Sequence, residues 1–189
     1  GAAGADRGGA ARPLAVGSEP RRPVFSFFFF GTKTREWIVI SSGSSTTSED
    51  RLLSADNPSE AFAVFMPRVQ DVEYDVYPHK DFFFIRYKDK ENLNGKIYQV
   101  AKSDYANRAA WKEMVAHNKD VRIENLNVQK EYIVIETRKN GLTEMEIRSL
   151  VTGKSRFVSF PEPVYNAYSS GNPEYDAATF RYSYTSLNR

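Results

Sequence analysis

Apolar residues in this chain fall into short runs separated by polar corners, a pattern typical of a β protein. The runs predict strands over residues 37–41, 50–55, 61–66, 72–77, 82–87, 96–101, 123–128, 132–138, 143–150 and 156–160. Small polar residues and glycine lie between the runs, and the Asn-Gly pairs at 94–95 and 140–141 are strong hairpin signals. Only residues 104–115, around Trp111, indicate a helical turn before a short outer strand. The pattern therefore predicts an all-β fold.

A phrase that recurs four times gives these strands a common plan. A polar corner, an aromatic residue and a short apolar strand follow one another at residues 35–40 (REWIVI), 80–85 (KDFFFI), 130–135 (KEYIVI) and, more weakly, 178–183 (ATFRYS). The aromatic positions are 45, 50 and 48 residues apart. A repeat of roughly 40–50 residues that holds four strands is the signature of a propeller blade.

Counting the copies gives about three blades and the beginning of a fourth. Closed propellers have roughly four to eight blades, so we expect an open arc that is part of a larger protein. The end blades of an arc expose faces that a neighbour would cover, as the end repeats of an uncapped array do. We therefore expect marginal stability or aggregation of the isolated chain.

Residues 1–30 differ from the rest of the chain in composition. Residues 1–23 are mainly glycine, alanine, arginine and proline, and such a segment buries too little apolar surface to offset its ordering entropy. We expect residues 1–30 to be a disordered or unrelated leader, although residues 24–30 (VFSFFFF) can pair as a strand whose register the pattern does not determine. Four arginines against Asp6 and Glu19 in this leader account for the net charge of +2.

The remaining residues, 31–189, are electrically neutral, which argues against a nucleic acid partner because phosphate binding needs a basic stripe. The chain has no run of about 18 apolar residues, so no membrane partner is expected. It contains no cysteine, which excludes disulfides and cysteine metal sites and fits a reducing, cytoplasmic location. Its two histidines, His79 and His117, lie 38 residues apart on predicted loops without ligand spacing, so we expect neither metal nor cofactor.

The motifs that could carry catalysis are weak. The nucleophile pattern Gly-x-Ser-x-Gly is absent, and residues 153–155 (GKS) echo a phosphate loop but lack its upstream glycine and fall in a predicted hairpin turn.

Two pairs of carboxylates could attract a basic substrate. Glu144 and Glu146 share one strand face, as do Glu73 and Asp75. Ion pairs with neighbouring arginines or lysines on a solvated face are the favoured interpretation. The phenylalanine runs are better explained by packing between blades than by a binding patch. The predicted catalytic, cofactor-binding and metal-binding residues are therefore none.

Several stretches resemble one known family. They are residues 45–53 (STTSEDRLL), 72–74 (VEY), 131–134 (EYIV), 141–143 (GLT), 172–174 (NPE) and 181–187 (RYSYTSL), of which the last two are the most specific. In order and without large gaps, they resemble the oligopeptidase B (protease II) branch of the prolyl oligopeptidase family over about residues 33–189.

The resemblance implies that residues 31–189 are a partial β-propeller, about three to four blades of four-stranded antiparallel sheet out of an expected seven. In that family the propeller caps an α/β-hydrolase domain with a Ser, Asp, His triad, and this branch cleaves peptides after Arg or Lys. No triad residue has a counterpart in the chain.

We therefore expect the propeller portion of a serine oligopeptidase, which gates the access of peptides to a hydrolase domain absent from this chain and is inactive alone. The expected partners are that hydrolase domain and peptide substrates. The alternatives are a non-catalytic β-propeller module for protein interaction and a truncated inactive product. A β-sandwich binding domain is disfavoured by the repeat length.

Overall fold

The computed structural model describes residues 26–187, which form fourteen strands and two short 3-10 helices. Three antiparallel sheets have four strands each, in chain order, and a hairpin follows them. The first sheet consists of β1 (Ser26–Gly31), β2 (Trp37–Gly43), β3 (Ser48–Ser54) and β4 (Ala63–Val64). The second consists of β5 (Glu73–Pro78), β6 (Phe82–Lys88), β7 (Lys96–Ala101) and β8 (Lys112–Val115), with η1 (Lys102–Asp104) and η2 (Arg108–Ala110) between the last two strands. The third consists of β9 (Val121–Val128), β10 (Tyr132–Lys139), β11 (Leu142–Ser149) and β12 (Ser155–Phe157), and the hairpin is β13 (Tyr165–Ser169) with β14 (Tyr182–Ser186).

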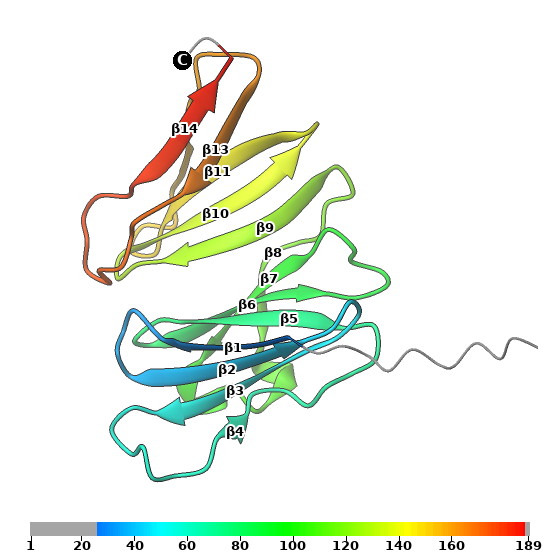
Figure 1. Ribbon diagram of the computed structural model, residues 1–189, viewed down its shortest axis with the longest axis vertical. Helices are drawn as coiled ribbons and strands as arrows, with labels where there is room; N and C mark the ends of the chain where they lie inside the picture. Colours follow the sequence, from blue (N-terminus) through cyan, green and yellow to red (C-terminus); the bar gives the residue numbers. More distant parts are fainter. Residues whose placement is uncertain (1–25, 188–189) are drawn as a thin grey trace, which may run out of the picture.

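The sheets follow one another along an arc. Figure 1 shows the first sheet at the bottom of the view and the second sheet in the middle of the molecule. The third sheet lies above the second, and the β13–β14 hairpin is at the top. The first sheet and the hairpin do not meet, so the arc stays open. The predicted all-β partial propeller of three to four blades is thus confirmed.

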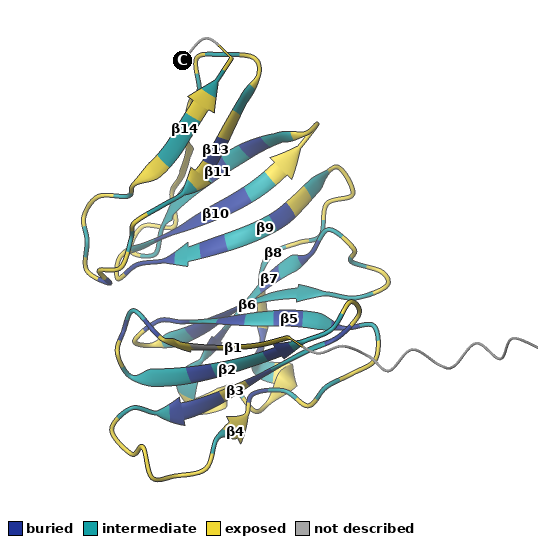
Figure 2. Cartoon of the chain, in the orientation of Figure 1, coloured by how far each residue is buried: buried dark blue, intermediate teal, exposed yellow. Residues whose placement is uncertain are grey.

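Neighbouring sheets pack face to face, and a hydrophobic core lies between each pair. This arrangement explains the continuous apolar runs of the repeated phrase. In β6, Phe83 and Ile85 face the first sheet, whereas Phe84 between them packs into the core shared with the third sheet. A strand that is covered on both faces needs consecutive apolar residues, not an alternating pattern. Figure 2 shows such buried stretches in dark blue along β9 and β10.

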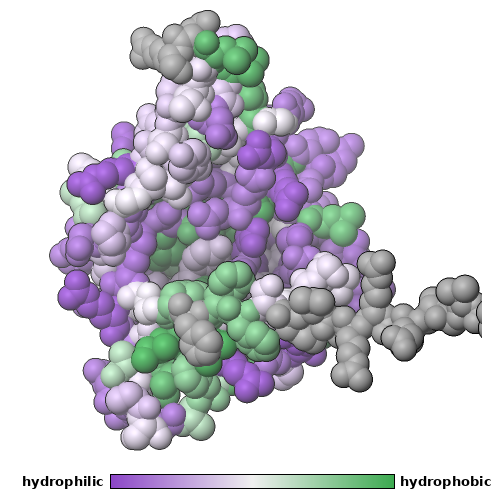
Figure 3. Space-filling view, viewed as in Figure 1, coloured by the Kyte–Doolittle hydropathy of each residue, from purple (hydrophilic) through white to green (hydrophobic). Residues whose placement is uncertain are grey.

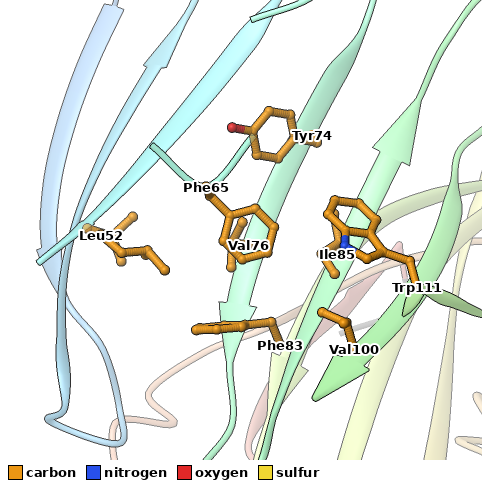
Figure 4. Close-up of a cluster of buried hydrophobic side chains, with 9 residues drawn as sticks. Leu52, Phe65, Tyr74, Val76, Phe83, Ile85, Val100 and Trp111 are labelled. Atoms are coloured by element: carbon orange, nitrogen blue, oxygen red, sulfur yellow. The ribbon is translucent and has the colours of Figure 1, made fainter. Parts of the chain in front are cut away.

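The core between the first and second sheets is rich in aromatic rings. Phe65, just after β4, lies with its ring centroid 5.3 Å from that of Phe83 and 5.7 Å from that of Trp111. Figure 4 shows these side chains beside Val76 and Val100 of the second sheet. Aromatic pairs at such separations add specific ring contacts to the burial of large apolar areas.

Within residues 26–187, no other sheet covers the face of the first sheet that points away from the second. Ile38 and Ile40 of β2 are only half-buried there, and Phe27 of β1 is 63% exposed. Figure 3 shows apolar surface gathered over the first sheet. A single exposed apolar residue is ordinary, but a contiguous apolar face usually marks an interaction surface.

Most predicted strands are confirmed within one or two residues at each end. The strand predicted over residues 24–30 is β1 from Ser26 on, and its register is set by pairing of Phe28 with Ser41 and of Phe30 with Val39. The first 25 residues of the predicted leader lie outside the described residues.

The largest differences lie in the outer strand β4 and in the last hairpin. β4 has only two residues, where residues 61–66 were predicted, and β13 was not predicted at all. The fourth copy of the phrase marks β14, which begins at Tyr182, two residues after the aromatic position.

The turns and the single predicted helical region behave as their residues require. Asn140 and Gly141 both have positive φ, 50° and 82°, as a type I′ hairpin needs. Gly95 instead ends a longer loop, residues 89–95, so the Asn-Gly pair at 94–95 does not form a two-residue hairpin. The turn predicted near Trp111 is present as η1 and η2, followed by the outer strand β8. No helix within residues 26–187 has the length and apolar character needed to cross a membrane.

Candidate functional site

The junction between the first and second sheets is held by side chains of β3 that bind the free edge of β5. The Asp50 carboxylate accepts hydrogen bonds from the Ser41 hydroxyl at 2.5 Å and from the backbone N–H of Val76 at 2.8 Å. Burial raises the pKa of Asp50 to about 6, against the lowering effect of these two hydrogen bonds, and the nearby charge of Asp75 raises it further. Part of the carboxyl population is therefore protonated at mildly acidic pH.

Tyr74 ties the same junction from the side of β5. Its hydroxyl accepts a hydrogen bond from the Asp50 N–H at 2.9 Å and donates to the carbonyl oxygen of Met66 at 2.6 Å. The Ser48 hydroxyl donates to the Tyr74 carbonyl oxygen at 2.6 Å and accepts from the Tyr74 N–H. These bonds satisfy backbone groups that β5 would otherwise leave unpaired in a buried place.

Arg86 carries the junction between the second and third sheets. Its guanidinium binds Asp75 at 2.6 Å within its own sheet and donates to the carbonyl oxygens of Ile123 at 3.3 Å and Glu124 at 2.8 Å on β9. The Tyr77 hydroxyl reaches the amide oxygen of Asn125 on the same strand at 3.3 Å.

The corners between the first two strands of each sheet form a second row of contacts. The buried ring of His79 accepts a hydrogen bond from the Asp81 N–H at Nδ1, so its Nε2–H donates to the Lys130 carbonyl oxygen at 3.0 Å. The Lys130 N–H in turn donates to the carbonyl oxygen of Tyr175 at 2.8 Å, and the Tyr175 hydroxyl accepts from the Lys80 N–H at 3.2 Å. These bonds join the second sheet, the third sheet and the last hairpin.

Lys33 extends this row to the first sheet. Its ammonium donates to the amide oxygen of Asn127 at 2.5 Å and to the side-chain oxygen of Gln129 at 3.1 Å. The Gln129 amide is oriented with its oxygen towards Lys33, since this satisfies both ends of the amide. Its nitrogen then donates to the carbonyl oxygens of Glu174 and Tyr175, at 2.6 and 3.0 Å. Burial lowers the pKa of Lys33 to about 8.

Ion pairs contribute little to these junctions. In the described part of the chain, only the pair between Lys102 and Glu36, 2.7 Å apart, joins two different blades. The remaining pairs lie within one sheet, its own loops or the segment that leads into it, as between Arg86 and Asp75. Hydrogen bonds to backbone groups and apolar packing therefore hold neighbouring blades together.

The first strands of the three sheets line an open cavity of about 390 Å³. Its walls are mostly apolar and include Phe28 and Phe30 from β1, Val76 from β5 and Leu126 from β9. Lys33, Asp50 and Asp75 supply the charged groups at its surface. Because the first strand of each blade faces the axis of a propeller, this cavity lies on the side of the arc where a central channel would run.

Three of the four carboxylates singled out in the sequence form ion pairs, and Glu144 forms none within residues 26–187. Glu146 pairs with Arg148 at 2.7 Å, Glu73 with Lys88 at 3.2 Å and Asp75 with Arg86, as the favoured interpretation predicted. Arg138, expected as a partner of the β11 carboxylates, instead binds Glu124 at 2.8 Å.

Two further features of the sequence have no catalytic geometry. Gly153, at a φ of 71°, and Lys154 end the turn before β12, and Ser155 is the first residue of that strand. Residues 26–187 contain no group of three or more metal-ligating side chains. The junction residues Asp50, Lys33 and Tyr175 were not singled out in the sequence, since nothing in it tells a junction residue from an ordinary surface one.

Comparisons with known proteins agree with this architecture. The family model described as the prolyl oligopeptidase N-terminal beta-propeller domain matches residues 15–189. The chain is 34% identical over 163 residues to dipeptidyl aminopeptidase BI of Pseudoxanthomonas mexicana, covering 85% of the chain and 22% of that protein. It is 23% identical over 169 residues to protease 2 of Moraxella lacunata, covering 89% of the chain and 24% of that protein.

Solved structures give the same result. Oligopeptidase B from Trypanosoma brucei, in its closed form, superimposes with a TM-score of 0.80 at 25% identity, covering 88% of the chain and 25% of that structure. Oligopeptidase B from Leishmania major gives 0.78 at 26% identity, covering 89% and 25%. The chain thus spans about a quarter of the length of these relatives. The chain belongs to the prolyl oligopeptidase family, and what it contains is a stretch of that family's N-terminal β-propeller domain.

Proposed function

We propose that this chain is the part of a serine oligopeptidase that gates access of peptides to a separate α/β-hydrolase domain. The observation that carries the proposal is the series of three four-stranded sheets around one inner cavity, within a match to the propeller domain of a peptidase family. In this proposal the propeller part of the chain begins with β1, not at residue 31.

The geometry of the described residues favours a structural role for this part of the protein over a catalytic one. His79 binds backbone groups through both ring nitrogens, so neither is free to activate a serine hydroxyl. The Gly-x-Ser-x-Gly pattern is missing from all 189 residues. The nucleophile, acid and base would come from the hydrolase domain.

A ring of blades restricts substrates by size. A narrow channel admits an extended peptide and excludes a folded protein of larger diameter. Blade junctions made of hydrogen bonds and apolar contacts keep their spacing at high salt, because screening acts mainly on exposed charges. We propose further that the whole enzyme cleaves after Arg or Lys and works in the cytoplasm, which the lack of cysteine supports.

The first test uses the chain alone. Incubated with a dibasic fluorogenic peptide, it should release no fluorophore. Turnover that a serine-directed inhibitor abolishes would contradict the proposal, because the active site would then lie within these residues.

The second test uses the full-length protein and distinguishes the peptidase types. An N-acetylated peptide with one internal arginine should be cut after the arginine, and the same sequence within a folded protein should not. The name of one relative, dipeptidyl aminopeptidase, suggests instead release of dipeptides from a free amino terminus. Cleavage of only the unacetylated peptide, two residues from its end, would favour that activity. Equal cleavage of the folded protein would rule out gating by size.

A further inference from the structure

Three aromatic rings of the second blade surround one cation far from the inner cavity. The guanidinium carbon of Arg108 lies 4.9 Å from the ring centroid of Tyr87, 4.5 Å from that of Tyr98 and 4.0 Å from that of Trp111. The rings are inclined to one another, by 80° between the two tyrosines and by 58° between Tyr98 and Trp111. Three inclined rings around one cation form an aromatic cage.

The walls of this cage belong to fixed elements. Tyr87 and Tyr98 lie on the neighbouring strands β6 and β7, on the face that packs against the first sheet. Trp111 is buried, and its indole N–H donates to the Tyr105 carbonyl oxygen at 2.9 Å. Its ring also contacts Phe65 of the first sheet, as Figure 4 shows. These contacts hold the rings in place whether or not a cation lies between them.

The occupant is held much less firmly than the walls. Arg108 is exposed and belongs to the three-residue helix η2. Within residues 26–187 its guanidinium has neither an ion pair nor a side-chain hydrogen bond, so the rings provide the contacts that hold it. A rigid cage with a single exposed side chain in it can exchange that side chain for another cation.

We propose that Tyr87, Tyr98 and Trp111 form a binding site for the guanidinium group of an external arginine side chain, a site that Arg108 occupies from within the chain. The class of ligand follows from the occupant, because a planar guanidinium stacks on rings in a way that an ammonium does not. The site uses the middle strands β6 and β7 and the residue before β8. It does not rest on the proposed peptidase function.

Competition with Arg108 predicts how the site responds to ligand. A tethered group acts at an effective concentration of the order of millimolar, so an external arginine binds weakly while Arg108 is present. Removal of Arg108 leaves the cage empty and should strengthen binding at least tenfold.

The test follows the indole N–H resonance of Trp111 by NMR, with the Trp37 resonance as the internal reference for folding. The probe is N-acetyl-arginine amide, and its matched control is N-acetyl-citrulline amide, which has the same shape without the charge. In the Arg108→Ala variant we expect a saturable shift of Trp111 with the arginine probe, at a Kd at least tenfold below that of the unchanged chain, and none with citrulline.

A second variant, Arg108→Ala with Tyr98→Leu, removes one ring but keeps apolar volume, and it should lose the shift while the Trp37 resonance stays in place. The proposal is overturned if folded Arg108→Ala shows no saturable shift, if citrulline binds as well as arginine, or if the double variant binds as well as Arg108→Ala.

Discussion

Strands β2 and β10 carry almost the same phrase and lie in different surroundings. In β10, Ile133 and Ile135 are buried against the second sheet and Val134 against the β13–β14 hairpin. In β2, Val39 is equally buried, but Ile38 and Ile40, at the positions of Ile133 and Ile135, are half-buried. The two strands have nearly the same sequence. They differ in whether a neighbouring sheet covers the face that carries the two isoleucines.

This difference shows what the repeated phrase specifies. It encodes a strand for the middle of a blade that has a neighbour on each side, and the second and third sheets each have such neighbours on both faces. The first sheet has the residues for two neighbours and one neighbour in the structure. Its free face is therefore best explained as a surface for a further blade.

The largest expected effect comes from truncating equivalent isoleucines. Ile133→Ala should lower the free energy of unfolding by about 2–5 kcal/mol, since it removes buried methylenes and leaves a cavity. Ile38→Ala, at the same position of the phrase, should cost about 1 kcal/mol, within the common range for single substitutions. Urea denaturation of both variants gives the comparison, and equal losses would show that the face of β2 is as well covered as that of β10.

The next effect concerns pH at the covered junction between the first and second sheets. Because the folded-state pKa of Asp50, about 6, lies above its ordinary value of 3.8, the folded chain binds its proton more tightly than the unfolded chain. The stability from this group is complete at pH below about 4 and is lost as pH rises to about 6. The expected loss is on the order of 2–3 kcal/mol, because each tenfold difference in proton affinity corresponds to about 1.4 kcal/mol.

Asp50→Asn should remove this pH dependence. The asparagine oxygen can still accept from the Val76 N–H, and its nitrogen can donate to a reoriented Ser41 hydroxyl. The measurement is the unfolding midpoint in urea between pH 4 and pH 7, with Asp120→Asn on an exposed loop as the control. An unchanged slope in Asp50→Asn would assign the pH dependence to other groups.

A smaller effect is expected at the corner contacts of the last hairpin. Tyr175→Phe removes the acceptor of the Lys80 N–H and should cost about 1 kcal/mol, the usual net value of one hydrogen bond. Tyr168→Phe, whose side chain is half exposed on β13, is the matched control and should change stability little. Thermal unfolding followed by circular dichroism is sufficient, and equal effects would mean that the corner bond does not stabilise the junction.

The smallest effect belongs to the ion pair that joins two blades. A double-mutant cycle with Glu36→Gln and Lys102→Met should give a coupling energy of about 0.2–1 kcal/mol that falls as salt is added, because both side chains are partly exposed. A coupling above about 2 kcal/mol, or one insensitive to salt, would contradict a junction held mainly by packing and backbone hydrogen bonds.

The fold was largely predictable because its signals are local. The apolar runs and the repeat length gave the order of strands and the number of blades, and φ at Asn140 and Gly141 follows from their residue types. The outer strands were predicted less well, since β4 and β12 have little burial to specify them. β13 was missed because the apolar residues around Tyr165 are too sparse for a run.

The junctions could not be predicted, because their partners are far apart in the chain. Lys33 and Asn127 are separated by 94 residues, and Lys80 and Tyr175 by 95. The aspartate at position 50 gave no sign that its carboxylate binds the edge of another sheet. Contacts of this kind depend on how the blades pack, which no local pattern records.

Whether the free face of the first sheet is an uncovered blade face is tested most directly by two matched double variants. Lysine is placed at both isoleucines of β2 (Ile38→Lys with Ile40→Lys) or at both isoleucines of β10 (Ile133→Lys with Ile135→Lys), and each chain is studied by sedimentation velocity and urea unfolding. We predict that the β2 variant folds with nearly unchanged stability and associates less than the unchanged chain, whereas the β10 variant fails to fold. Failure of the β2 variant to fold, or folding of the β10 variant, would contradict an uncovered blade face on the first sheet.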